Sequence, residues 1–223
     1  MEDKKIIFFD VDGVLVFSME KSTTLLCQII ENARLDFDLR IIENNWGHSF
    51  RGVIIPLLAE SGNWPDFKKE LILEKSREFF ENTHFNSPDG LSSKFNLLKV
   101  SGYELGIITN RDHKMLEKAC SDMSVDMSIF TFLQTADDCF QKPDPRVFDK
   151  ALKSFEAKDI IFVGDSPICD LPAAYNGENK IDFVGITSII HKKERFVDAG
   201  VPEKLVYDSV LNFIDDMLVL QTV

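Results

Sequence analysis

Four short stretches of continuously apolar, β-branched or aromatic residues recur along the chain, at 5–10, 104–109, 159–164 and 182–187. Strands covered on both faces of a parallel sheet have this composition, because neither face meets water. Helical spacing and turn signals predict helices over 88–100, 111–121, 145–156, 170–176, 190–198 and 209–220. The alternation of strands and helices favours an α/β fold with a doubly wound parallel sheet.

The stretch from about 17 to 86 departs from this rhythm, because it offers several helical patterns and no comparable strand. The apolar face of its first helix is formed by Leu25, Leu26, Ile29, Ile30 and Ala33. Its last helix repeats Phe67, Leu71, Lys75 and Phe79 at every fourth position. We therefore expect residues 17–86 to form an inserted all-helical cap domain, and residues 1–16 and 87–223 to form the α/β core domain.

Composition narrows the partners of the chain. Its formal net charge is -12, and acids and bases alternate along it instead of forming basic blocks, which argues against nucleic acid as a ligand. The longest apolar runs fall short of the roughly 20 residues that span a bilayer, so we expect no membrane association. The four cysteines are widely scattered, without zinc-site spacing, which suits reduced thiols in the cytoplasm. The oligomeric state stays open.

Polar side chains follow three of the predicted strands at the point where each strand ends. Asp10 and Asp12 follow the first, Thr109 and Asn110 the second, and Asp165 the third. Asp170 comes shortly after, and Lys142 lies in the loop sequence QKPDP. Because ligands of an open parallel sheet bind at the carboxyl ends of its strands, we expect these residues to converge on one crevice.

Carboxylates placed this close together cannot all ionise without a cation among them. Hard oxygen ligands favour Mg²⁺, and a phosphate could then be held between the metal, an ammonium group and hydroxyl or backbone donors. One acid would remain for attack or for proton transfer. The set therefore predicts Mg²⁺-assisted chemistry on a phosphate group.

Four short motifs in chain order carry a resemblance to a known family. The sequences DVDGVLV, IITN, KPDP and VGDSPICD resemble the four motifs of the haloacid dehalogenase superfamily. The resemblance is to its phosphatase branch with a helical cap inserted after the first strand, the branch of phosphoglycolate phosphatase and β-phosphoglucomutase. It covers the whole chain. It implies a phosphoric monoester hydrolase that acts on a small phosphorylated metabolite.

The resemblance also implies a role for each candidate residue. Asp10 would be the nucleophile that takes the phosphoryl group as an aspartyl-phosphate. Asp12 would protonate the leaving oxygen and then activate water. Thr109 and the backbone amide of Asn110 would hold phosphate oxygens, while Lys142 would neutralise charge.

The same resemblance implies the metal site. Mg²⁺ would be bound by the carboxylate of Asp10, the carbonyl of Asp12 and the carboxylate of Asp165. Asp170 would support the waters of the metal or Lys142. Gly13 is expected to free the backbone for a turn after Asp12.

Two other kinds of binding site share part of this pattern. An EF-hand loop also begins Asp-x-Asp, but its next ligand and its glycine would fall at Val14 and Leu15. The glycines of GHSFRG have the spacing of a P-loop, yet Val53 and Ile54 stand where Lys and Ser or Thr are needed. Arg51 is a candidate substrate contact because arginine suits bidentate anion binding, and a solvated surface arginine is the alternative.

Three functions remain open at this point: a Mg²⁺-dependent phosphatase, a sugar phosphomutase of the same superfamily, and a catalytically silent regulatory or binding protein. The phosphomutases carry a cap histidine, whose corresponding place here is near Ser22. Phe17 stands where the phosphoglycolate phosphatase pattern has a different residue. We expect Phe17 to make the entrance to the site more apolar.

Overall fold

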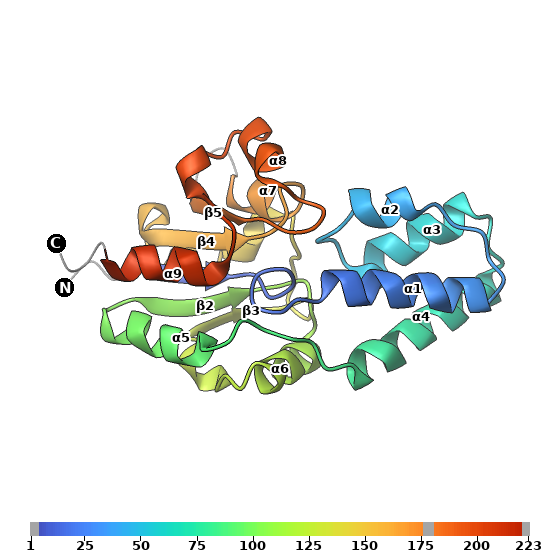
Figure 1. The fold of residues 1–223 in the computed structure, drawn as a ribbon, viewed down its shortest axis with the longest axis horizontal. Helices are drawn as coiled ribbons and strands as arrows, with labels where there is room; N and C mark the ends of the chain where they lie inside the picture. The colour runs from blue at the N-terminus through green and yellow to red at the C-terminus, as the bar shows by residue number, and fades with distance from the viewer. Residues whose placement is uncertain (1–4, 176–180, 220–223) are drawn as a thin grey trace.

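A parallel sheet of six strands forms the centre of the larger lobe (Figure 1). The structure is a computed structural model that describes residues 5–175 and 181–219. The strands are β1 (Ile6–Phe9), β2 (Glu104–Ile108), β3 (Phe132–Gln134), β4 (Ile160–Gly164), β5 (Asp182–Ile186) and β6 (Val206–Tyr207). They lie in the order β3-β2-β1-β4-β5-β6, and every pair is parallel. The predicted doubly wound α/β fold is confirmed.

Alternate residues of β1 enter two different hydrophobic clusters, one on each face of the sheet. Ile7 and Phe9 pack in a cluster with residues of α5 (Leu91–Val100), α6 (His113–Asp122) and α9 (Val210–Val219). Ile6 and Phe8 pack in the other, with residues of α7 (Asp170–Ala174) and α8 (Lys193–Asp198). Burial on both faces explains why the strand sequences are apolar without alternation.

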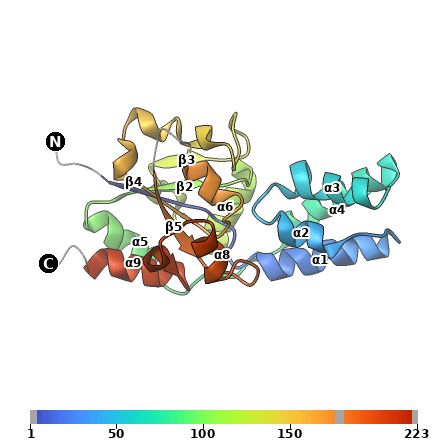
Figure 2. The same ribbon diagram turned by 90° about the horizontal axis from the view of Figure 1, so that it is seen from above.

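The smaller lobe contains helices α1 (Met19–Asn32), α2 (Leu39–Asn44), α3 (Ile55–Ser61) and α4 (Asp66–Asn82). A π-helical turn, Phe50–Ile54, leads into α3. Both ribbon views place these helices together, beyond the end of the sheet (Figures 1 and 2). They pack around a hydrophobic cluster of their own that includes Leu26, Ile30, Ile54, Leu58 and Ile72.

The expected apolar face of α4 is wrong in part. Phe67 and Leu71 are exposed, whereas Ile72 and Ser76 are buried. The face that packs against the lobe is displaced by one residue from the Phe67, Leu71, Lys75 repeat, and Lys75 pairs on the surface with Glu78. The stripe predicted on α1 is buried or half-buried along its length.

The helix predicted over 145–156 is also wrong. Two short 3₁₀ segments stand there, Pro145–Phe148 and Ala151–Lys153. The side chain of Asp144 accepts from the backbone N–H of Arg146 and pairs with its guanidinium, which favours a tight first turn. Strands β3 and β6 were not predicted, since three and two residues are too few for a recognisable pattern.

The remaining predicted elements lie where expected, with shifts of a few residues at their ends. The predicted helices over 170–176 and 209–220 each end on a residue outside the described range. Among the described residues, no helix is long and apolar enough to span a membrane.

Candidate active site

The carboxyl ends of the adjacent strands β1 and β4 bring the predicted acids together. The backbone N–H of Asp10 donates to Val163 O at 2.9 Å, which fixes the end of β1 against β4. Carboxylate oxygens of Asp10, Asp165 and Asp170 all lie within 4.8 Å of one another. All three residues are buried. Their convergence follows directly from the parallel sheet, because adjacent strands end at the same edge.

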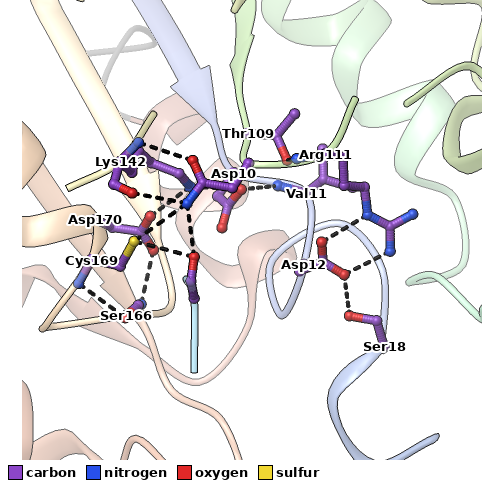
Figure 3. A network of polar contacts seen from close by, with 12 residues as sticks. Asp10, Val11, Asp12, Ser18, Thr109, Arg111, Lys142, Ser166, Cys169 and Asp170 are labelled. Atoms are coloured by element: carbon purple, nitrogen blue, oxygen red, sulfur yellow. Dashed lines mark hydrogen bonds and ion pairs between the residues drawn. The ribbon is translucent and has the colours of Figure 1, made fainter. Parts of the chain in front are cut away.

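Lys142 lies between two of these acids (Figure 3). Its Nζ is 2.8 Å from Asp10 Oδ1 and 2.6 Å from Asp170 Oδ1. Burial by itself lowers the pKa of Lys142, but the two carboxylates outweigh burial and leave that pKa raised. Burial raises the pKa of Asp10 to about 7, although Lys142 acts in the opposite direction.

The two oxygens of Asp10 have different surroundings. Oδ1 accepts from the backbone N–H of Val11 at 2.7 Å and faces Lys142. Among the described residues, no hydrogen-bond donor is found for Oδ2. One oxygen is therefore fixed by the protein while the other is left available.

Asp165 is the exceptional member of the cluster. Both of its carboxylate oxygens are buried, and neither has a hydrogen-bond partner in the described part of the chain. Burial raises the pKa of Asp165 well above its usual range, and Asp170 and Asp10 raise it further. Gly13 allows this arrangement, because a Cβ on Gly13 would lie 1.9 Å from Asp165 Oδ2. A buried carboxylate without a hydrogen-bond donor from the protein is suited to bind a cation.

These residues fit a divalent cation. Three carboxylates within reach of one point form a hard oxygen set of the kind that Mg²⁺ takes. The side chain of Asp12 is not part of this group. Its expected contribution, through the backbone carbonyl, stays a prediction.

Asp12 has a separate environment, which sequence reasoning missed. Arg111 donates to it twice, from Nε to Oδ2 at 2.7 Å and from Nη2 to Oδ1 at 2.6 Å, and the hydroxyl of Ser18 also donates to Oδ1 (Figure 3). Burial alone would raise the pKa of Asp12, but Arg111 outweighs it and holds that pKa below its usual range. The available signal was the position of Arg111 directly after Thr109 and Asn110.

Thr109 and Asn110 lie at the end of β2, beside Asp10 and Lys142. The buried Thr109 accepts at Oγ1 from the backbone N–H of Arg111 at 3.2 Å. The amide side chain of Asn110 accepts from Lys142 N at 2.9 Å and donates to Lys142 O at 3.0 Å, so it holds the lysine loop. Within the described residues, no acceptor is found for the backbone N–H of Asn110.

Two backbone carbonyls of the smaller lobe accept hydrogen bonds from loops of the larger lobe. Ser166 Oγ donates to Trp46 O at 3.1 Å. Cys169 Sγ and Asn110 Nδ2 both donate to Gly47 O, at 3.1 and 3.0 Å. The lobes therefore meet at the same residues that hold Lys142 in place.

A cavity of about 330 Å³ opens between the lobes. From the sheet side it is lined by Asp10, Asp12, Thr109, Asn110 and Arg111. From the helical side it is lined by Ser22, Trp46, His48, Arg51 and Arg77, among others. Arg51 thus lies on the cavity. Phe17 lies instead on a second, smaller cavity and is exposed, so the prediction that it forms the entrance is wrong.

The sequence matches the haloacid dehalogenase-like hydrolase family over residues 7–186. A protein of Pyrococcus furiosus named glyceraldehyde 3-phosphate phosphatase is 26% identical, with 96% of this chain and 91% of that protein covered.

Solved structures agree on the fold. A predicted phosphoglycolate phosphatase from Haemophilus somnus has a TM-score of 0.75 at 17% identity, covering 97% of this chain and 99% of its own. A chain from Bacteroides vulgatus, assigned by prediction as a beta-phosphoglucomutase, has a TM-score of 0.77 at 18% identity and covers 99% and 90%. At these identities the likeness shows the fold alone.

The raised pKa values of Asp10 and Asp165 predict an unusual pH dependence of stability in the metal-free protein. From about pH 4 to pH 7 the folded state holds more protons than the unfolded state, so the free energy of unfolding should fall as pH rises. Urea unfolding in the presence of a chelator should show this fall in the wild type and a weaker one in Asp10→Asn. The lowered pKa of His191, caused first by burial, acts in the opposite sense, but both proteins share it. Parallel curves of unfolding free energy against pH for the two proteins would contradict a raised pKa of Asp10.

The contact between the lobes predicts that Gly47→Ala is destabilising. Gly47 has a φ of +99°, and a Cβ there would lie 2.8 Å from Ser166 Oγ and 3.0 Å from Cys169 Cβ. The backbone conformation alone costs on the order of 1–3 kcal/mol for a residue other than glycine. Gly200→Ala is the matched control, since Gly200 has a φ of +95° and open space around the added Cβ. Urea unfolding should show a larger loss for Gly47→Ala. Equal losses would mean that the close approach to the Ser166 loop carries no energy.

Proposed function

Because the chain belongs to the family of haloacid dehalogenase-like hydrolases, we propose that it is a Mg²⁺-dependent phosphatase of small phosphate monoesters. The observation that carries the proposal is the buried acid cluster, in which Lys142 bridges Asp10 and Asp170 while the described residues offer Asp165 no donor. The Pyrococcus furiosus relative, named as a phosphatase of a small phosphorylated metabolite, supports it.

Asp10 is the proposed nucleophile. Its Oδ2, for which the described residues supply no donor, would form a bond to phosphorus while the bond from phosphorus to the leaving oxygen breaks. Oδ1 stays anchored by Val11 N and Lys142, which orients the carboxylate for this attack. Attack needs the ionised form, and a pKa of about 7 leaves Asp10 partly protonated in neutral solution without a further cation.

Mg²⁺ is the proposed cation, held by Asp10 and Asp165 and by the backbone carbonyl of Asp12. When bound, it would supply positive charge that favours the ionised acids and the transferring phosphoryl group. Asp170 would fix Lys142 through the 2.6 Å ion pair, and its Oδ2 already accepts from the backbone N–H of Ser166 at 2.9 Å.

Asp12 is the proposed proton carrier. Its carboxyl group would give a proton to the leaving oxygen in the first step and accept one from the water that attacks the aspartyl-phosphate in the second. Inorganic phosphate then leaves and Asp10 is regenerated. Thr109 Oγ1 and the backbone N–H of Asn110 would hold phosphate oxygens, beside Lys142.

The helical lobe is the proposed cap domain, residues 17–86, and the remainder of the chain is the proposed core domain. The helical lobe presents Arg51 to the cavity as a proposed substrate contact. Among the described residues, no ion-pair partner is found for Arg51. A cavity of about 330 Å³ suits a small metabolite. The four cysteines are free thiols, which suits the cytoplasm as the proposed compartment.

Hydrolysis is favoured over isomerisation by the residue at the place of the phosphomutase histidine. Ser22 stands near that place, buried and on the cavity, and a serine hydroxyl does not titrate near neutral pH as an imidazole does. A silent binding protein is disfavoured because every proposed catalytic side chain is present and Asp10, Asp12 and Thr109 line one cavity.

The proposal is tested by incubating the purified protein with Mg²⁺ and a panel of phosphate monoesters and measuring the release of inorganic phosphate. Asp10→Asn should lower kcat by at least about 1,000-fold, since it removes the nucleophile. Asp215→Asn, an exposed aspartate paired with Lys94 on the far helices, should retain activity. The proposal fails if no ester in the panel is turned over, or if Asp10→Asn is as active as the wild type.

A further inference from the structure

Arg111 is the one cavity-lining cation that forms a bidentate pair with a proposed catalytic acid. Its side chain is 8% exposed and that of Asp12 is 31% exposed, so the pair is shielded on the arginine side and open on the aspartate side. Such forked pairs fix both distance and orientation of a carboxylate. Nothing in the motifs of the chain assigned this residue a role.

Arg111 is itself held rigidly. Its backbone N–H donates to Thr109 Oγ1, and its carbonyl accepts from Ala136 N at 2.8 Å. Its guanidinium carbon lies 5.3 Å from the centre of the buried Phe85 ring. A cation stacked on an aromatic ring and fixed at its backbone is a stable support for another side chain.

The hydrogen bonds leave Asp12 with little freedom. A carboxylate has about four lone-pair sites. Arg111 Nη2 and Ser18 occupy the sites on Oδ1, and Arg111 Nε occupies one on Oδ2. In the described part of the chain this leaves a single acceptor site, on Oδ2, for chemistry.

We propose that Arg111 is a positioning residue that directs the free site of Asp12 Oδ2 to the leaving oxygen of the substrate. This inference rests on the proposed phosphatase function. The monoanion of the phosphate ester supplies a proton to the free site of the ionised Asp12 Oδ2, and Oδ2 passes it to the leaving oxygen as the bond from phosphorus to that oxygen breaks and the bond from phosphorus to Asp10 forms. The attacking water later returns a proton to the same atom. Arg111 touches neither phosphorus nor the leaving group and acts through Asp12.

Leaving-group dependence separates this role from a structural one. Departure of an alkoxide needs a proton, whereas p-nitrophenolate leaves without one. The comparison is kcat/KM for p-nitrophenyl phosphate and for glyceraldehyde 3-phosphate, or for the best alkyl ester of the panel. Arg111→Gln should lower the value for the alkyl ester by about 10- to 100-fold and the value for p-nitrophenyl phosphate by less than about threefold.

Three further variants complete the test. Asp12→Asn should show the same selective loss, and the double variant with Arg111→Gln should be no worse than Asp12→Asn alone, because both act through one group. Arg111→Lys should recover part of the loss, since lysine offers one donor but not the fork. Arg40→Gln is the matched control. Arg40 forms the same bidentate pair with Asp38, but the pair is exposed and does not line the cavity.

Thermal unfolding of each variant is measured to check that it folds. If Arg111→Gln does not fold, Ser18→Ala replaces it in the comparison, because Ser18 supplies the third hydrogen bond to Asp12. Equal losses on both esters, or losses that multiply in the double variant, would overturn the inference while leaving the phosphatase function intact. A wild type that turns over neither ester would instead overturn the proposed function itself.

Discussion

Four carboxylates share one crevice, and their mutual repulsion is the constraint on which the rest of the site depends. Lys142 lies within 2.8 Å of Asp10 and 2.6 Å of Asp170, and Arg111 takes Asp12. With all four acids ionised, the two cations would leave a net charge of minus two in the crevice, and Asp165 is the acid without a hydrogen-bond partner among the described residues. Burial makes that net charge expensive, because an unpaired charge in a poorly solvated site has no water to stabilise it. A divalent cation beside Asp165 would offset it.

The fold brings the four acids close together and also determines how closely they approach one another. Asp10 and Asp165 follow adjacent strands, β1 and β4, so their separation is set by the sheet. Two glycines allow the acids to approach the backbone: a Cβ on Gly13 would collide with Asp165, and a Cβ on Gly164 would lie 2.5 Å from Asp170. The helical lobe then contacts the same loops through backbone carbonyls. These backbone contacts bring no charged group to the loops, while the arginines of the lobe, Arg51 and Arg77, line the cavity.

Much of this could be predicted from the sequence, and the rest shows what local patterns omit. The strands bearing Asp10, Thr109 and Asp165 were predictable because apolar runs of four or five residues are distinctive, and the parallel sheet then places their ends together. The pair of Arg111 with Asp12 was not, because the two residues are 99 positions apart and the direction of a long side chain is not written in a motif. Contacts of the backbone carbonyls of Trp46 and Gly47 leave no side-chain pattern either. The buried face of α4 was also predicted wrongly, because residues that repeat every four positions can form a stripe next to the buried face instead of on it.

The buried acids are proposed to form a site for a divalent cation centred on Asp165. Calorimetric titration of the metal-free protein with MgCl₂ tests it most directly, with Asp165→Asn as the comparison. The wild type should show one binding site and Asp165→Asn a large loss of affinity, because neither oxygen of the Asp165 carboxylate has a hydrogen-bond partner among the described residues. Equal Mg²⁺ affinity in the two proteins, or no binding in the wild type, would contradict it.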